Sequence, residues 1–245
     1  MNITRDMKMA DVIHFNYSLL PVITRFGINL GFGDRSVEEV CKQHQVNLDF
    51  FLEITNSFID DEYIPQKDLH SFSVKLIVDY LQKTHDYYLE EKIPELENMI
   101  NEMVVKTEAD NLKSELVRNF FNEYHEELKN HIQREESRVQ PYVLEIEGAF
   151  ESGSLDPSLR KRIKEYSIND FAREHDNVEE KLYDLKNIII KYLPPCPDKA
   201  LCNRLLMELY RLEKDLNAHA ELEDKVLIPK VAGMEEYLLT LNSEN

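Results

Sequence analysis

Apolar residues recur at intervals of three or four along most of the chain after residue 67. This spacing places them on one face of an α-helix. Four segments show the pattern, and we expect long helices at 68–99, 108–147, 166–193 and 198–230. Amphipathic helices of this length bury their apolar stripes by packing against one another. The pattern therefore predicts an all-α protein built around a four-helix bundle.

Turn-forming residues separate these segments. The stretch GAFESGSLDPSLR (148–160) is the clearest predicted loop. PPCP (194–197) ends the third helix, because consecutive prolines cannot continue one. MEEYLLTL, within residues 233–245, adds at most a turn or two of helix, and we assign these residues to a C-terminal tail. No stretch shows the sustained alternation that is typical of a β-strand.

The first part of the chain is predicted to form a small helical unit of its own. Ser36 and Asn47 each precede a helical run, where their side chains favour an N-cap. The acidic stretch DDEYIPQKD (60–68) contains a proline and indicates a linker. The expected organisation is thus a helical N-terminal domain over 1–62, a bundle over 67–232 and the tail.

A histidine, or a histidine and a glutamate, interrupts each apolar stripe near its middle. The pattern His-x3-Glu-x5-Pro-x-Val occurs twice, and each copy is preceded by a lone histidine on another stripe. The separation from lone to paired histidine is 46 residues in the first copy and 44 in the second. The residues concerned are His85, His131 and Glu135 in the first copy, and His175, His219 and Glu223 in the second.

These six residues predict a metal site. An unpaired glutamate in a bundle core costs several kcal/mol, so two glutamates that converge there need a compensating positive charge. Imidazole and carboxylate ligands without thiolate suit iron or manganese, and less distinctively zinc. A single His-x3-Glu is more often a solvated surface pair, and a lone histidine more often a core residue. The duplication at matched offsets favours the metal site. Pro141 and Pro229, ten residues after each paired histidine, are expected to kink or end their helices.

Three neighbours of the lone histidines could assist them. Tyr88 follows His85 by about one helical turn and could reach the site. Asp86 and Asp176 directly follow the lone histidines and could hold the imidazole N–H groups. Adjacent residues on a helix point about 100° apart, however, which favours other partners for these two aspartates.

Composition excludes several function classes. A net charge of -18 argues against nucleic acid and against a polybasic membrane contact. No apolar run approaches the ~20 residues of a membrane span, and the N-terminus lacks a signal-peptide pattern. The three cysteines form no CxxC and fit reduced thiols better than a disulfide framework. We therefore expect a cytoplasmic protein.

The duplicated core resembles the hemerythrin-like (HHE cation-binding) superfamily. More narrowly, the front piece FGINLGFGDRSVEEVC (26–41) ahead of the bundle resembles the iron-sulfur cluster repair di-iron proteins, the repair-of-iron-centres family. That resemblance implies two iron ions bridged by both glutamates and an oxo or hydroxo group, with an exchangeable position for a small ligand. The six residues above are the ligands it implies: His85, His131, Glu135, His175, His219 and Glu223.

The resemblance also implies a role. Repair of iron-sulfur centres damaged by nitric oxide or oxidants would make damaged iron-sulfur proteins its partners, and O2 or NO its small ligand. This points to an iron donor or diatomic-binding protein rather than a turnover enzyme. One departure matters, since Gly31 and Phe32 replace the family's adjacent cysteine pair and only Cys41 remains. The alternative is therefore an O2- or NO-binding sensor or carrier without repair activity.

Overall fold

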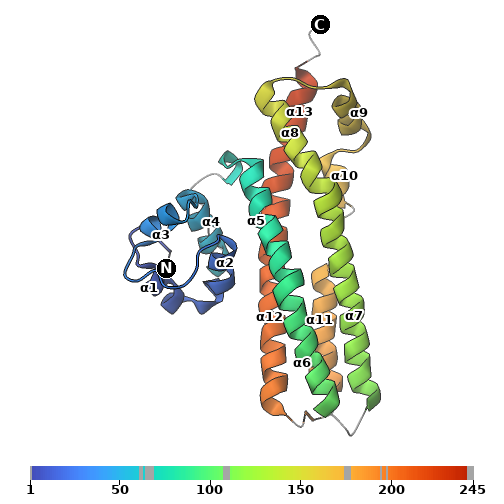
Figure 1. Ribbon diagram of the computed structural model, residues 1–245. Helices are drawn as coiled ribbons and strands as arrows, with labels where there is room; N and C mark the ends of the chain where they lie inside the picture. The colour runs from blue at the N-terminus through green and yellow to red at the C-terminus, as the bar shows by residue number, and fades with distance from the viewer. Residues whose placement is uncertain are drawn as a thin grey trace. The chain divides into compact units, whose positions relative to one another are not determined.

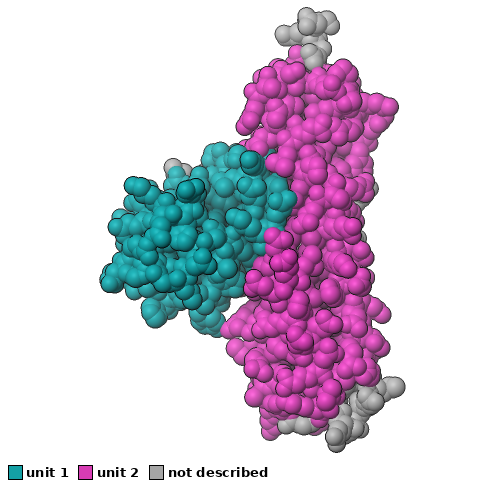
Figure 2. Space-filling model, in the orientation of Figure 1, with its two compact units in different colours: residues 1–84 teal, residues 85–245 magenta. Residues whose placement is uncertain are grey.

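The chain divides into two compact units. The computed structural model describes residues 2–60, 63, 69–106, 111–173, 178–193, 195–196 and 198–241. Unit 1 spans Met1–Thr84 and unit 2 spans His85–Asn245, and Figure 2 colours them separately. The expected linker, residues 60–68, falls mostly outside the described residues. The boundary between the compact units lies further along the chain, inside a helix.

Unit 1 is helical, as its sequence predicts. Its elements are α1 (Met9–Phe15), the 3-10 turn η1 (Tyr17–Leu19), α2 (Leu20–Arg25), α3 (Val37–Gln43), α4 (Leu48–Ile59), the 3-10 turn η2 (Leu69–Ser71) and the start of α5 (Val74–Asp86). Ser36 caps α3 in a capping box with Glu39. Asn47 accepts a hydrogen bond from the backbone N–H of Phe50 at the start of α4. Both predicted N-caps are therefore confirmed.

An aromatic cluster forms part of the core of unit 1. Phe26 lies at the centre, with its ring 5.1 Å from that of Phe51 and 5.0 Å from that of Tyr80. Phe50 packs edge-on against Phe72 at 5.2 Å. Edge-to-face aromatic pairs of this kind add stability beyond the apolar area they bury. Phe26 can lie inward because the next residue, Gly27, turns the chain with a φ of 73°.

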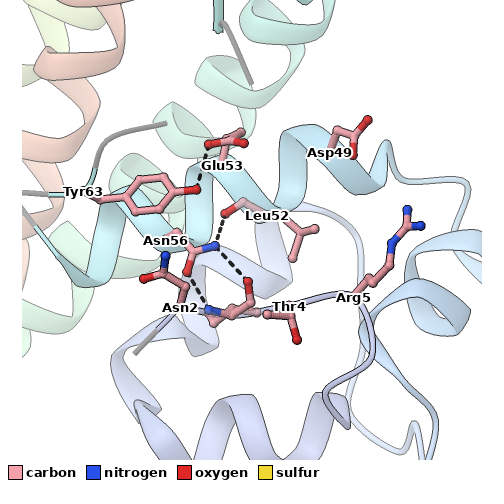
Figure 3. A pocket seen from close by; sticks show the side chains of 9 residues that line it. Asn2, Thr4, Arg5, Asp49, Leu52, Glu53, Asn56 and Tyr63 are labelled. Atoms are coloured by element: carbon pink, nitrogen blue, oxygen red, sulfur yellow. Dashed lines mark hydrogen bonds between the residues drawn. The ribbon is translucent and has the colours of Figure 1, made fainter. Parts of the chain in front are cut away.

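The N-terminal segment is fastened to α4 beside a cavity of about 370 Å³ (Figure 3). The Asn56 side chain accepts the backbone N–H of Ile3 at 2.6 Å and donates to the Ile3 carbonyl at 3.0 Å. On another side of the cavity, Tyr63 donates its hydroxyl proton to Glu53 at 3.0 Å. The buried amide of Asn56 thus makes hydrogen bonds through both its oxygen and its nitrogen, and these bonds hold the N-terminal segment in place of a neighbouring strand.

Unit 2 contains the bundle (Figure 1). Its elements are the π-helical turn η3 (Tyr87–Lys92), α6 (Ile93–Lys106), α7 (Asn111–Arg134), the π-helical turn η4 (Glu135–Val139), α8 (Gln140–Ser152), α9 (Pro157–Glu165), α10 (Ile168–Arg173), α11 (Val178–Tyr192), α12 (Lys199–Leu222), the π-helical turn η5 (Glu223–Leu227) and α13 (Ile228–Thr240). No β-strand occurs among the described residues. The predicted all-α class is confirmed.

Four of these helices enclose one core. Helix α6 packs against α7, α7 against α11, α11 against α12, and α12 against α6, so the contacts close into a ring. Each helix contributes fully buried apolar residues to it, for example Leu96, Phe121, Leu185 and Leu209. Phe121, Leu185 and Leu209 lie on the stripes that the sequence pattern predicts. Above this ring, α8 packs against α13, and α10 also contacts α13 (Figure 1).

Three π-helical turns let the long helices pass a proline. Each turn ends two residues before Pro94, Pro141 or Pro229. In an α-helix, the proline ring clashes with the carbonyl four residues earlier. In η4 and η5 the residue before the proline instead bonds five residues back, from Gln140 to Glu135 and from Ile228 to Glu223. Neither long helix therefore ends at its proline, which excludes the predicted helix end and leaves the predicted kink as the alternative.

Several predicted boundaries change. The expected loop 148–160 is helical at both sides, since α8 continues to Ser152 and α9 begins at Pro157. Gly153, with a φ of 63°, supplies the left-handed residue that ends α8. The third helix is described as α10 and α11, and residues 174–177 between them lie outside the described residues. Part of the assigned tail, residues 233–240, continues the fourth helix as α13.

The cysteines depart from the expected reduced thiols. Cys196, in the connection between α11 and α12, forms a disulfide with Cys202 near the start of α12, and their Cα atoms are 6.6 Å apart. Cys41 is free and fully buried in α3. Burial raises the pKa of the Cys41 thiol to about 12. Among the described residues, no helix is both long and apolar enough to cross a bilayer.

Thiol titration tests this arrangement. We expect the air-oxidised native chain to show no reactive thiol, since Cys41 is buried and the other two cysteines are paired. Unfolding without reductant should expose one thiol, and unfolding after reduction all three. A colorimetric thiol assay at about pH 8 measures each state. Three thiols in the unreduced, unfolded chain would show that the disulfide is absent.

Candidate metal centre

Buried histidines and glutamates from separate helices meet in unit 2. His85 lies at the end of α5, Glu135 begins η4, and His219 and Glu223 lie where α12 meets η5. Ligand atoms of these four residues all lie within 4.8 Å of one another. Each of the four is less than 9% exposed. The structure thus brings together four of the six residues that the sequence singles out.

The imidazoles of His85 and His219 face each other. Their Nε2 atoms are 3.3 Å apart, and their ring centroids are 5.0 Å apart. Glu135 Oε2 lies 3.2 Å from Nε2 of His85, and Glu223 Oε1 lies 3.5 Å from Nε2 of His219. Two ring nitrogens and two carboxylate oxygens therefore converge on one buried point.

The Glu135 carboxylate extends to a second imidazole. Its Oε1 atom lies 2.9 Å from Nε2 of His131, while its Oε2 atom is the one directed to His85. His131 is 7% exposed and one helical turn before Glu135, as the His-x3-Glu spacing predicts. The sixth predicted residue, His175, lies outside the described residues. His131 therefore adjoins the four-residue cluster through the shared carboxylate.

The acceptor for the N–H group of His85 is not the adjacent aspartate. Asp86 is exposed, in agreement with the helical phase, which favours other partners for it. Glu136 takes that place, with its Oε1 atom 3.0 Å from Nδ1 of His85. Tyr88 does lie beside the centre, fully buried, with its ring 5.9 Å from that of His219 in an edge-on arrangement. The only sequence signal for this role of Glu136 was its position directly after Glu135, a predicted ligand.

The surroundings favour a positive charge on His85. Burial by itself lowers the pKa of this imidazole, but the hydrogen bond and charge of Glu135 raise it. The charge of Glu223 and the hydrogen bond to Glu136 act in the same direction, and the pKa of His85 lies above its ordinary value. The site therefore attracts a proton or another cation.

The donor set fits a metal ion. With Nδ1–H of a neutral His85 directed at Glu136, its Nε2 carries a lone pair that faces the acceptor oxygen of Glu135. Acceptors that converge at this distance repel one another unless a cation lies between them. Neutral imidazole nitrogens and carboxylate oxygens are ligands that first-row transition metals accept. The cluster is thus a cation site by its own chemistry.

The family comparison agrees with this geometry. The sequence model of the hemerythrin HHE cation-binding domain matches residues 76–231, which is more than half of the chain. The chain belongs to this family. The match spans the helices that hold the cluster, so the predicted superfamily resemblance is confirmed and the protein is a metal-binding, hemerythrin-like protein. No curated protein gives a match to the chain.

Metal binding should depend on pH through His85. A metal can bind Nε2 only after the proton leaves, and the raised pKa of His85 keeps that proton to higher pH. We expect the apparent affinity for Fe(II) or Zn(II) to fall as the pH falls through this raised pKa, by up to about tenfold per pH unit for each displaced proton. Chelator competition between about pH 8 and pH 5 measures this.

A matched variant shows whether the effect belongs to the centre. His125→Gln removes a half-buried histidine of α7 that lies outside the cluster and should leave the pH profile unchanged. An affinity that stays constant or rises on acidification would contradict the proposed competition between proton and metal.

Proposed function

We propose that the chain is a non-haem di-iron protein that acts in the repair of iron-sulfur centres or in the nitrosative and oxidative stress response. The observation that carries the two-metal proposal is the position of Glu135, whose two oxygens face different imidazoles, those of His85 and His131. A carboxylate in this position is suited to bridge two metal ions. A site for one metal would need only one of these contacts.

The residues present divide naturally between two ions. His85 and His219, with one oxygen each from Glu135 and Glu223, would hold the first ion. His131 and the other oxygen of Glu135 would hold the second, together with His175, which the sequence repeat supplies. Four imidazoles and two carboxylates favour iron, with manganese or zinc as the other metals that this donor set accepts. When bound, an iron pair supplies the electrons and an exchangeable position for O2 or NO.

The protein itself supplies geometry and exclusion of water. His85 and Tyr88 are each 1% exposed, and Glu223 is 7% exposed. Such a centre meets a small diatomic ligand more readily than a larger substrate. These features support a ligand-binding or iron-holding role over turnover of an organic substrate.

A second candidate function is O2 or NO binding by a sensor or carrier without repair activity. The observation that favours it lies in unit 1. Gly31 has a φ of 100°, and Phe32 is 6% exposed in the core. These residues stand where the repair family has its cysteine pair, and Cys41, the only cysteine of this unit, is fully buried. A hand-off of iron through exposed thiols of unit 1 therefore has no residue to perform it.

Removal of the shared carboxylate tests the two-metal centre. We expect Glu135→Ala to lower the iron content of the chain by much more than half, because both ions lose a ligand and the remaining imidazoles lose their shared anion. Metal analysis after anaerobic loading and desalting measures this. The control Glu126→Ala removes an exposed glutamate of the same helix and should leave the iron content unchanged. Loss of half the metal or less would contradict a bridging role.

An iron-transfer experiment distinguishes the repair function from the sensor or carrier function. Iron-loaded protein is mixed with an iron-sulfur enzyme inactivated by NO, with and without a chelator that traps released iron. Restored activity without the chelator, and loss of restoration with it, supports repair by iron donation. A reversible NO-dependent change in the optical spectrum, without any restoration of the enzyme, supports the sensor or carrier.

A further inference from the structure

Two consecutive carboxylates hold both ring nitrogens of one imidazole. Glu135 Oε2 lies 3.2 Å from Nε2 of His85, and Glu136 Oε1 lies 3.0 Å from Nδ1 of the same ring. Neighbouring residues of a regular α-helix point about 100° apart. Here the π-helical turn η4 begins at Glu135, so both carboxylates stand where the helix geometry departs from the regular one. The ring lies between two side chains of a single segment.

The second imidazole of the cluster has no such support. Nδ1 of His219 is buried and has no hydrogen-bond partner in the part of the chain that the structure describes. Its ring is instead contacted by the edge of Tyr88. The two facing imidazoles are therefore unequal. Of the two, only His85 has a carboxylate that accepts a hydrogen bond from the ring nitrogen turned away from the cluster.

We propose that Glu136 is a positioning residue of the metal centre, which acts through His85. By accepting the Nδ1–H of His85, it holds the ring in one orientation and one tautomer, with the Nε2 lone pair directed at the metal. A carboxylate acceptor also makes the imidazole a more basic ligand, which favours the more oxidised metal. This inference rests on the proposed di-iron function and deepens it.

The exposure of Glu136 sets the size of the expected effect. Its side chain is 42% exposed, whereas His85 is 1% exposed. Water can therefore approach the Nδ1–H when the carboxylate is removed and can replace part of the lost hydrogen bond. Removal of a carboxylate behind a ligating histidine weakens metal binding by about 10- to 100-fold. For Glu136 we expect the lower end of this range.

Three variants of the full chain separate orientation from charge. Glu136→Ala removes the acceptor, and Glu136→Gln keeps an acceptor oxygen without the charge. Glu126→Gln makes the same charge change at an exposed position of α7 and is the control. Each protein is loaded anaerobically with Fe(II), its affinity is measured by chelator competition, and its midpoint potential is measured by optical redox titration.

We expect Glu136→Ala to bind iron about tenfold more weakly than wild type. Glu136→Gln should recover most of that affinity, because its amide oxygen still orients the ring. Both variants should have a higher midpoint potential than wild type, since neither carries the charge, and Glu126→Gln should match wild type in both measurements. Wild-type affinity and potential in Glu136→Ala would overturn the proposal and leave the di-iron function standing.

A metal-free measurement keeps the two proposals distinguishable. Nitrogen-15 NMR of the apo chain, at a pH high enough to keep the ring neutral, reports which nitrogen of His85 carries the proton. We expect the Nδ1–H tautomer in wild type and in Glu136→Gln, and a mixture in Glu136→Ala. If wild type binds no iron, the di-iron function fails. The tautomer then decides the role of Glu136 alone, and an unchanged Nδ1–H in Glu136→Ala overturns it.

Discussion

The electrostatics of two buried glutamates govern unit 2. Glu135 and Glu223 lie within the core of a bundle, next to imidazoles whose unprotonated ring nitrogens offer lone pairs rather than positive charge. Without a cation, this arrangement buries negative charge among acceptors, which is costly in a low-dielectric interior. A metal ion reverses the sign of the interaction. Because the ligands come from α5, η4 and the α12–η5 junction, metal binding also ties these segments together, and its free energy becomes folding free energy.

Helical phase explains why the cluster could be predicted from the sequence. His131 and Glu135 share a face because they are four residues apart, and the apolar stripe around them, for example Phe121 and Leu128, turns that face inward. The duplication then supplies the second half of the site. Residues that repeat at fixed offsets on a buried helix face can be predicted from the sequence, because local helix geometry alone determines which of them share that face.

Other features depend on packing that the sequence pattern does not encode. The contact between Glu136 and His85 joins residues that are 51 positions apart, a separation that helical periodicity does not address. The π-helical turns were not predicted, because the predicted helices follow a 3.6-residue period. Pro141 and Pro229 were a signal that the period changes near them. The disulfide was missed because three cysteines without a CxxC give no pairing, whereas the fold brings Cys196 and Cys202 together across a tight connection.

Unit 1 has a core of its own, distinct from the metal cluster of unit 2. Phe32 and Cys41 are core residues there, and their burial leaves the unit without an accessible thiol among the described residues. The most direct test is the metal content and optical spectrum of the wild-type chain, purified in air and then loaded with iron. Two irons per chain with oxo-bridge absorption are the predicted result. A single tightly bound iron, or no transition metal even after loading, would contradict the shared two-metal centre.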